Sequence, residues 1–207
     1  MPRLTDATKA ARRAQITEAA ISCFLEKGYT NTSMSDIIKA SGLSSGSIYS
    51  HFSGKEDILI TAINERLNNV KELYETLPEG AGPQDILETI HTNQLVNDNF
   101  SAMLRIRAGS LHAPEIARAT ADTMPLLQGI IVKTLTPWAA EQLSVLHEIN
   151  PNSAQRTPEQ EALIADYARD TADAFMMVFQ GYMLRSFFGT PKEKDRLYRV
   201  ASALLPE

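Results

Sequence analysis

Hydrophobic residues recur along this chain at the spacing of an amphipathic α-helix. Before Gly28, apolar side chains stand at positions i, i+3, i+4, i+7 and i+8, which places them on one helix face. Gly28 is predicted to end this helix, because glycine readily takes the left-handed conformation that closes one. No stretch alternates between apolar and polar residues, so the pattern predicts an all-α protein. The residues of this first stripe are Ile16, Ala19, Ala20, Cys23 and Phe24.

Two short helices are predicted next. Ser33 is placed to cap the first, with Asp36 three residues on as the reciprocal acid of a capping box, and this helix ends near Gly42. Ser44 is placed to cap the second, which runs towards Phe52. Two short helices joined by a tight turn, after a longer helix, have the geometry of a helix-turn-helix.

The remaining segments also have helical periodicity. Ser53 and Glu56 predict the start of a long helix over 55–77. Pro137 is expected to kink or split the helix in which it lies. Proline, glycine and asparagine separate the other predicted helices, which cover about 84–97, 100–111, 114–122, 125–149, 158–188 and 191–205.

Composition narrows the classes of protein that fit. The chain has 207 residues and one cysteine, so we expect no disulfide framework, no cysteine-based metal site and a reducing, cytoplasmic location. No apolar run approaches the roughly 18 residues of a membrane span, and the charged start lacks the apolar stretch of a secretory signal. No phosphate-binding glycine loop, metal-ligand pair or nucleophile elbow is present, which predicts neither an enzyme nor a resident metal or cofactor.

Charge is unevenly distributed. Residues 1–55 carry seven lysines and arginines against four acids, while the rest of the chain brings the net charge to −5. This pattern leaves open a basic DNA-binding arm on an acidic body, or simply a solvated tail. In the arm, Arg12 and Arg13 are favoured over Arg3 and Lys9 to reach phosphates or a minor groove.

The run from Ile21 to Leu59 resembles the DNA-binding region of the tetracycline-repressor (TetR) family of bacterial transcription regulators. The shared residues are Phe24, Lys27-Gly28-Tyr29, Thr32-Ser33, Asp36-Ile37, Gly42-Leu43-Ser44, Gly46-Ser47-Ile48-Tyr49, His51-Phe52 and Lys55-Glu56. The resemblance implies about nine helices in all. It implies a helix-turn-helix DNA-binding domain at 1–54 and a ligand-binding and dimerisation domain at 55–207, linked by the 55–77 helix.

The resemblance also implies roles for individual residues. Thr32, Tyr49 and Lys55 are expected to contact phosphates, and Ser33 and Ser44 to cap the two short helices. Serine reads base edges indiscriminately, so specificity must also use His51, the arm, backbone positioning or DNA shape. The residues expected in or near the groove are Ser45, Gly46, Ser47, Ser50 and His51.

In the C-terminal part, the resemblance implies a two-fold dimer through the last two helices and a small-molecule cavity. Ordinary core packing remains the simpler interpretation of each apolar cavity residue, and Arg107 is a candidate to pair either with an anionic ligand or with Glu115. The dimer candidates are Tyr167, Thr171, Phe175, Val178, Tyr182, Leu197, Val200 and Leu204. The cavity candidates are His91, Gln94, Leu95, Met103, Leu104, Arg107, Leu127, Gln128, Ile131, Trp138, Met176, Met177 and Gln180.

Together these features predict a ligand-responsive transcriptional regulator, most simply a repressor. It would bind a pseudo-palindromic double-stranded DNA operator as a homodimer and be released by a small apolar or amphipathic effector, without a membrane partner. The alternative is a helical dimeric interaction module that does not bind DNA. The two differ in the salt dependence of DNA affinity, which is steep only for a protein that contacts phosphates.

Overall fold

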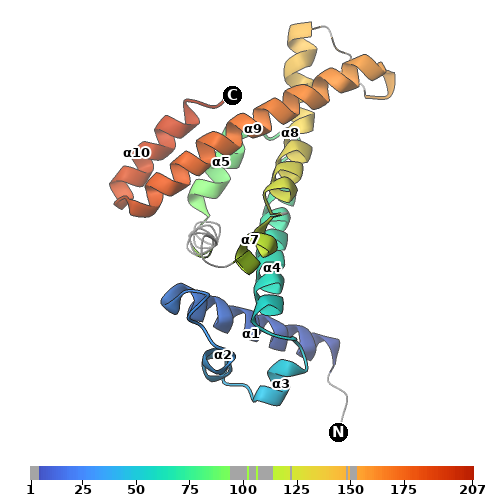
Figure 1. The fold of residues 1–207 in the computed structure, drawn as a ribbon. Helices are drawn as coiled ribbons and strands as arrows, with labels where there is room; N and C mark the ends of the chain where they lie inside the picture. Colours follow the sequence, from blue (N-terminus) through green and yellow to red (C-terminus); the bar gives the residue numbers. More distant parts are fainter. Residues whose placement is uncertain are drawn as a thin grey trace. The chain divides into compact units, whose positions relative to one another are not determined.

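The computed structural model describes residues 5–93, 102, 106, 114–121, 123–147, 149 and 153–207. Within these residues the regular structure is helical and contains no strand, which confirms the all-α prediction. The chain divides into two compact units (Figure 1). The first unit comprises Met1–Asn68 and Asn99–Thr123, and the second comprises Asn69–Asp98 and Met124–Glu207.

The first unit contains the predicted helix-turn-helix. α1 carries the first apolar stripe, and the short helices α2 and α3 follow it, drawn in blue in Figure 1. α4 starts in this unit and continues into the second, because the division between the units falls at Asn68. The helices are α1 (Asp6–Lys27), α2 (Met34–Ser41), α3 (Ser45–Tyr49), α4 (Lys55–Glu75) and α7 (Pro114–Thr120).

Local sequence explains where α2 begins and ends. The Ser33 hydroxyl accepts a hydrogen bond from the Asp36 amide at 3.2 Å, and the Asp36 carboxylate accepts one from the Ser33 amide at 2.9 Å. This is the predicted capping box. Gly42 ends the helix in the left-handed region, with φ 68° and ψ 10°. The turn before α3 therefore follows from residues that the sequence identifies.

One apolar core holds the first unit together. Side chains from all five helices are buried in it, which is why the unit extends beyond the predicted domain of residues 1–54. Ile58 and Leu59 of α4 are fully buried against this core, and Ile116 brings α7 into it. Its other members are Ile16, Ala20, Ile21, Phe24, Tyr29, Ile37, Ile48, Phe52, Ala62, Ile63, Ala102 and Ile106.

The second unit contains a hairpin of two helices. α9 (Pro158–Phe188) and α10 (Pro191–Ser202) form an antiparallel hairpin, and α5 (Pro83–Thr92) contacts both (Figure 1). α8 (Thr123–His147) begins at the end of the first unit and runs into the second, and the short 3-10 helix η2 (Ser153–Gln155) precedes α9. Thr157 and Thr190 cap α9 and α10, each in a capping box.

The structure excludes a split at Pro137, one of the two predicted outcomes there, and differs from the predicted start of α4. α8 is not split at Pro137 but continues through it. The start of α4 is capped through Asp57 rather than Glu56, because the Asp57 carboxylate accepts hydrogen bonds from the amide and hydroxyl of Ser53. Glu56 instead pairs with Arg118 at 3.4 Å.

Candidate DNA-binding site

α3 presents a small polar surface on the outside of the first unit. Its Ile48 side chain is fully buried in the core, which orients the helix, whereas Tyr49 is 52% exposed. Ser45 and Gly46 are exposed beside it. Hydroxyl groups of this kind serve as hydrogen-bond donors and acceptors towards phosphates and bases.

Three serines of this region use their hydroxyls within the protein. Ser44 accepts a hydrogen bond from the Ser47 amide at 3.2 Å and so caps α3. The Ser50 hydroxyl donates to the Ser47 carbonyl at 2.6 Å. The Ser47 hydroxyl accepts from Arg12 at 3.2 Å, which links α1 to the exposed side of α3. Arg12 and Ser47 therefore form one pair, at the place where the sequence predicts DNA contacts.

Arg13, the neighbour of Arg12, faces the interior of the unit. Its guanidinium donates to the His51 carbonyl at 2.9 Å and to the Thr61 hydroxyl at 3.3 Å. The same group lies over the Phe52 ring, 4.4 Å from its centroid. Arg13 thus joins α1 to the end of the α3 segment and to α4.

Lys55 is also bound within the unit. Its ammonium donates to the carbonyls of Tyr29 and Thr32, at 2.8 and 2.9 Å, and lies 4.3 Å from the centroid of the Tyr29 ring. This arrangement fastens the start of α4 to the loop between α1 and α2. A phosphate contact by Lys55 would compete with these three interactions.

Thr32 differs most from its expected role. The residue is buried, and its hydroxyl donates to the carbonyls of Cys23 and Gly28, at 3.2 and 2.8 Å. In this structure the hydroxyl therefore stabilises the end of α1 and does not face a possible phosphate. Sequence spacing does not reveal which way a loop side chain turns, and the phosphate contact of Thr32 stays a prediction.

The charged side chains of Asp36 and Lys27 near α2 are also paired within the protein. The hydrogen bond from Lys27, with further bonds from Ser33, holds the pKa of the Asp36 carboxyl far below its usual range. The same contact raises the pKa of Lys27. Burial raises the pKa of the Cys23 thiol, which fits its place in the core rather than a reactive role. Within the described residues no group of three His, Cys, Asp or Glu side chains is arranged to hold a metal ion.

Comparison with known proteins identifies the helix-turn-helix. Residues 16–62 match the family model of bacterial regulatory proteins of the tetR family. This segment is a tetR-family domain. The match covers the second half of α1, all of α2 and α3 and the start of α4, the segment in which the capping box, the Gly42 turn and the exposed face of α3 occur.

Curated proteins similar to this chain are transcriptional regulators. The chain is 29% identical over 133 residues to the fatty acid metabolism regulator protein of Bacillus subtilis, an alignment that covers 60% of this chain and 69% of that protein. It is 31% identical to the regulator BetI of Stenotrophomonas maltophilia, over 52% of this chain and 58% of the relative. It is 32% identical to the repressor KstR2 of Rhodococcus jostii, over 41% of this chain and 42% of the relative. The family and its members are regulators, which confirms the prediction that the chain is not an enzyme.

Solved structures share the fold over nearly the whole chain. The regulatory protein TetR of Rhodobacter sphaeroides superposes with a TM-score of 0.63 at 15% identity, covering 93% of this chain and 98% of its own. A TetR-family regulator of Cytophaga hutchinsonii gives a TM-score of 0.62 at 18% identity, with 98% and 96% covered. Among the described helices, none combines the length and apolar character that a membrane span requires.

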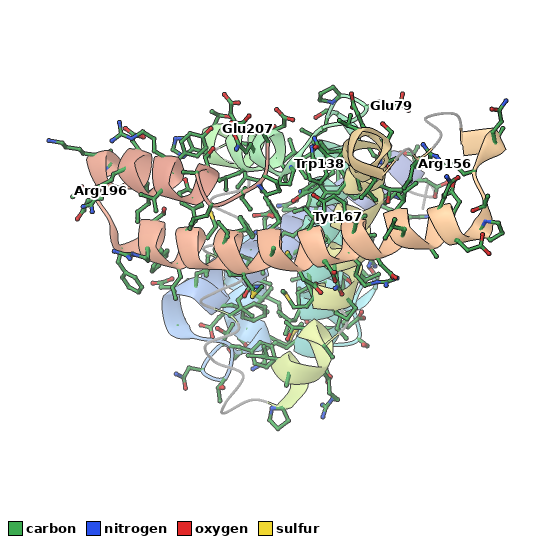
Figure 2. The ribbon with its side chains drawn as sticks, turned by 90° about the horizontal axis from the view of Figure 1, so that it is seen from above. Glu79, Trp138, Arg156, Tyr167, Arg196 and Glu207 are labelled. Carbon is green, nitrogen blue, oxygen red and sulfur yellow. The ribbon has the colours of Figure 1, made fainter. Side chains whose placement is uncertain are left out.

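In the second unit, several predicted cavity and dimer residues contact one another. The imidazole of His91 hydrogen-bonds the Tyr182 hydroxyl at 2.6 Å and stacks on the Tyr198 ring at 4.2 Å. Trp138 stacks on Tyr167, with 5.8 Å between ring centroids (Figure 2). In each pair a predicted cavity residue contacts a predicted dimer residue, so the two predicted sets are not separate in the structure.

Burial decides which of these side chains are available to a partner. Phe175, Thr171 and Tyr182 are buried within the chain, and their predicted contact with a second subunit stays a prediction. Met177, placed by the sequence in the cavity, is instead 71% exposed, and Gln180 is exposed as well. Val200 and Leu204 are exposed, whereas Tyr167, Val178 and Leu197 are partly buried.

The other cavity candidates have mixed environments. Ile131 and Met176 are buried, while Leu127 and Gln128 are partly buried. The Gln128 amide donates to the Asp173 carboxylate. Arg3 and the candidates Gln94, Leu95, Met103, Leu104 and Arg107 lie outside the described residues.

Sequence reasoning missed two exposed residues of α9. Leu184 is 47% exposed and Phe188 is 79% exposed, and together with Met177 they follow an i, i+7, i+11 spacing. This spacing places all three on one face of the helix. The signal was present in the sequence, but from Ala174 onward α9 is apolar on nearly every side, so periodicity alone does not separate the two faces.

Proposed function

We propose that this TetR-family protein is a ligand-responsive repressor that binds a pseudo-palindromic operator as a homodimer. The exposed face of α3 carries the proposal, with Ser45, Gly46 and Tyr49 as the groups that meet DNA and Arg12 beside them. A helix of this kind enters the major groove in helix-turn-helix proteins. The name of the Rhodococcus relative, a transcriptional repressor, supports repression.

Exposed apolar side chains support the dimer. Met177, Leu184 and Phe188 project from one face of α9, and Val200 and Leu204 are 51% and 69% exposed beyond α9. Large exposed apolar residues on adjacent helices are typical of an interface. A two-fold interface uses the same patch on both subunits, and it would bring two α3 helices to half-sites roughly 34 Å apart.

The effector is proposed to act on the second unit. α4 runs from the first unit into the second, so it connects the helix-turn-helix to the effector domain. A ligand shifts the equilibrium between operator-binding and released states only by its difference in affinity for them. We propose a small apolar or amphipathic compound, and the name of the Bacillus relative makes fatty acids the first class to test.

Selection of DNA by the purified protein tests the operator. The protein is incubated with a randomised duplex pool, and the enriched sequence is measured against a scrambled duplex. We expect an inverted repeat, with log K falling linearly as log salt rises, by about 0.9 for each phosphate contacted. Failure to enrich any sequence, or a flat salt response, favours the interaction module that does not bind DNA.

The dimer has its own test with a matched control. Met177→Glu combined with Phe188→Glu places charges in the proposed interface, and Val145→Glu alters an α8 side chain that is 81% exposed. We expect sedimentation equilibrium to show twice 22.8 kDa for the wild type and for Val145→Glu, but 22.8 kDa for the double variant. A wild-type monomer, or a double variant that stays dimeric, contradicts the proposed interface.

Release by an effector is measured on the selected duplex. Medium- and long-chain fatty acids are titrated into the complex, with the matching methyl esters to separate headgroup from chain. We expect at least one member to lower operator affinity and to raise the melting temperature of the free protein, because a ligand stabilises the state it binds. Compounds that bind the second unit without changing operator affinity would contradict its role as a sensor.

A further inference from the structure

We infer that Arg13 is a positioning residue for α3, acting from inside the first unit, and not a contact to the DNA backbone. The inference rests on the proposed operator binding and adds to it the residue that holds α3 in place. Sequence alone favours Arg12 and Arg13 equally, because both are cations of the N-terminal arm. The structure separates them.

The contacts of Arg13 involve three elements at once. The side chain comes from α1, the carbonyl that it binds belongs to His51, and the hydroxyl that it binds belongs to Thr61 of α4. His51 immediately follows the C-cap Ser50, and its amide donates to the Ile48 carbonyl at 2.9 Å. The guanidinium therefore holds the chain where α3 ends, between the helices on either side.

The Phe52 ring adds the third constraint. Phe52 is buried in the core, and the Arg13 guanidinium lies over its face. A planar guanidinium both stacks on an aromatic ring and donates along fixed directions, which an ammonium does not do. With two donors used and one face stacked, a phosphate contact would require Arg13 to leave its place in the unit.

Arg12 shows the contrast on the same helix turn. Adjacent residues of a helix point in different directions, and Arg12 reaches the Ser47 hydroxyl on the exposed side of α3. A cation there lies next to the proposed groove-facing residues. Of the two neighbouring arginines, only Arg13 is bound to a backbone carbonyl, a ring and a hydroxyl of the fold.

Thr61 allows a test that leaves charge unchanged. Thr61→Val removes the hydroxyl that accepts from Arg13, and Thr61→Ser keeps it. We expect operator affinity to fall about 3- to 10-fold in Thr61→Val, the range of one lost hydrogen bond, and to return to the wild-type value in Thr61→Ser. Because Arg13→Gln already breaks the same bond, the double variant with Thr61→Val should lose no more than Arg13→Gln.

Salt dependence separates positioning from phosphate contact. Affinities for the selected duplex are measured across a salt series, with the active fraction of each variant fixed by stoichiometric titration. We expect Arg13→Gln to lower affinity at every salt concentration without changing the slope of log K against log salt. Arg13→Lys keeps the positive charge but lacks the planar guanidinium with its fixed donor directions, so this variant should also lose operator affinity.

The opposite results overturn the inference. A phosphate contact predicts that Arg13→Gln reduces the slope by about 1.8 for the two copies in a dimer. It also predicts that Arg13→Lys binds nearly as the wild type does and that Thr61→Val has no effect. A wild-type protein that enriches no duplex overturns operator binding and this inference with it, whereas normal wild-type binding with any of these variant results overturns only the role of Arg13.

Discussion

Two glycines that end helices should differ sharply in their tolerance of substitution. Gly28 closes α1 and Gly42 closes α2, and both have positive φ, 80° and 68°. At neither position would an added Cβ meet another atom within 4 Å. The cost of replacing either glycine therefore comes from the backbone alone, without a contribution from packing.

The second dihedral angle decides the size of that cost. Gly42 has ψ 10°, the left-handed helical region, which costs other residues about 1–2 kcal/mol and which asparagine tolerates best. Gly28 has ψ 154°, a region that is almost restricted to glycine, where strain reaches about 3 kcal/mol. A residue with a Cβ also loses less chain entropy on folding, which offsets about 0.4–1 kcal/mol. We expect net losses of about 1 kcal/mol for Gly42→Ala, less for Gly42→Asn, and about 2 kcal/mol or more for Gly28→Ala.

Equilibrium unfolding in urea measures these losses. Far-UV circular dichroism at 222 nm follows helix content, and the fluorescence of Trp138, the one tryptophan in the sequence, follows the second unit. The midpoint of the first unit's transition should shift without a change in its slope. Equal losses for alanine at the two glycines, or an asparagine at Gly42 that costs as much as alanine, would refute the reasoning from backbone angles.

Three further predictions concern other contacts. The hydrogen bonds of Asp36 hold the pKa of its carboxyl low. Its contribution to stability is therefore present above the unfolded pKa of about 3.9 and is lost as pH falls below that value. When the pH is lowered, Asp36→Asn should lose less stability than the wild type. Tyr182→Phe removes the 2.6 Å bond to His91 and should cost about 1 kcal/mol in urea unfolding, whereas an unchanged midpoint would mean that the bond contributes nothing net. Gly82→Ala would bring a Cβ to 2.9 Å from the Trp138 indole nitrogen, so we expect a loss of about 1–3 kcal/mol and altered fluorescence, and an unaltered spectrum would contradict this packing.

Residues that lie close together in the chain predict much of this fold. The apolar stripe of α1, the Ser33–Asp36 capping box and the Gly42 turn each depend on residues close together in the chain. Such features can be predicted from the sequence because a helix repeats its face every three to four residues and because caps act over three residues. The family match over residues 16–62 covers the same segment, where local signals are strongest.

The positions of individual side chains in the candidate site did not follow from these rules. Thr32, Arg13 and Lys55 are polar residues in a segment that resembles a DNA-binding surface, yet each uses its polar group to bind carbonyls of the protein. Hydrogen bonds to Arg13 and Lys55 cross 23 to 48 residues of chain. No pattern of nearby residues encodes such contacts.

The sequence by itself determined the helices, their caps and the helix-turn-helix, because those depend on spacing within a few residues. Only the tertiary structure decided which polar groups are engaged inside the first unit and which face of α9 is covered. From Ala174 to its end, α9 is apolar around most of its circumference, so its own sequence does not distinguish a core face from a partner face there. Phe175 and Tyr182 are buried, Tyr182 with a hydrogen bond to His91 of α5, while Met177 and Phe188 are exposed, because burial is a property of what packs against a helix.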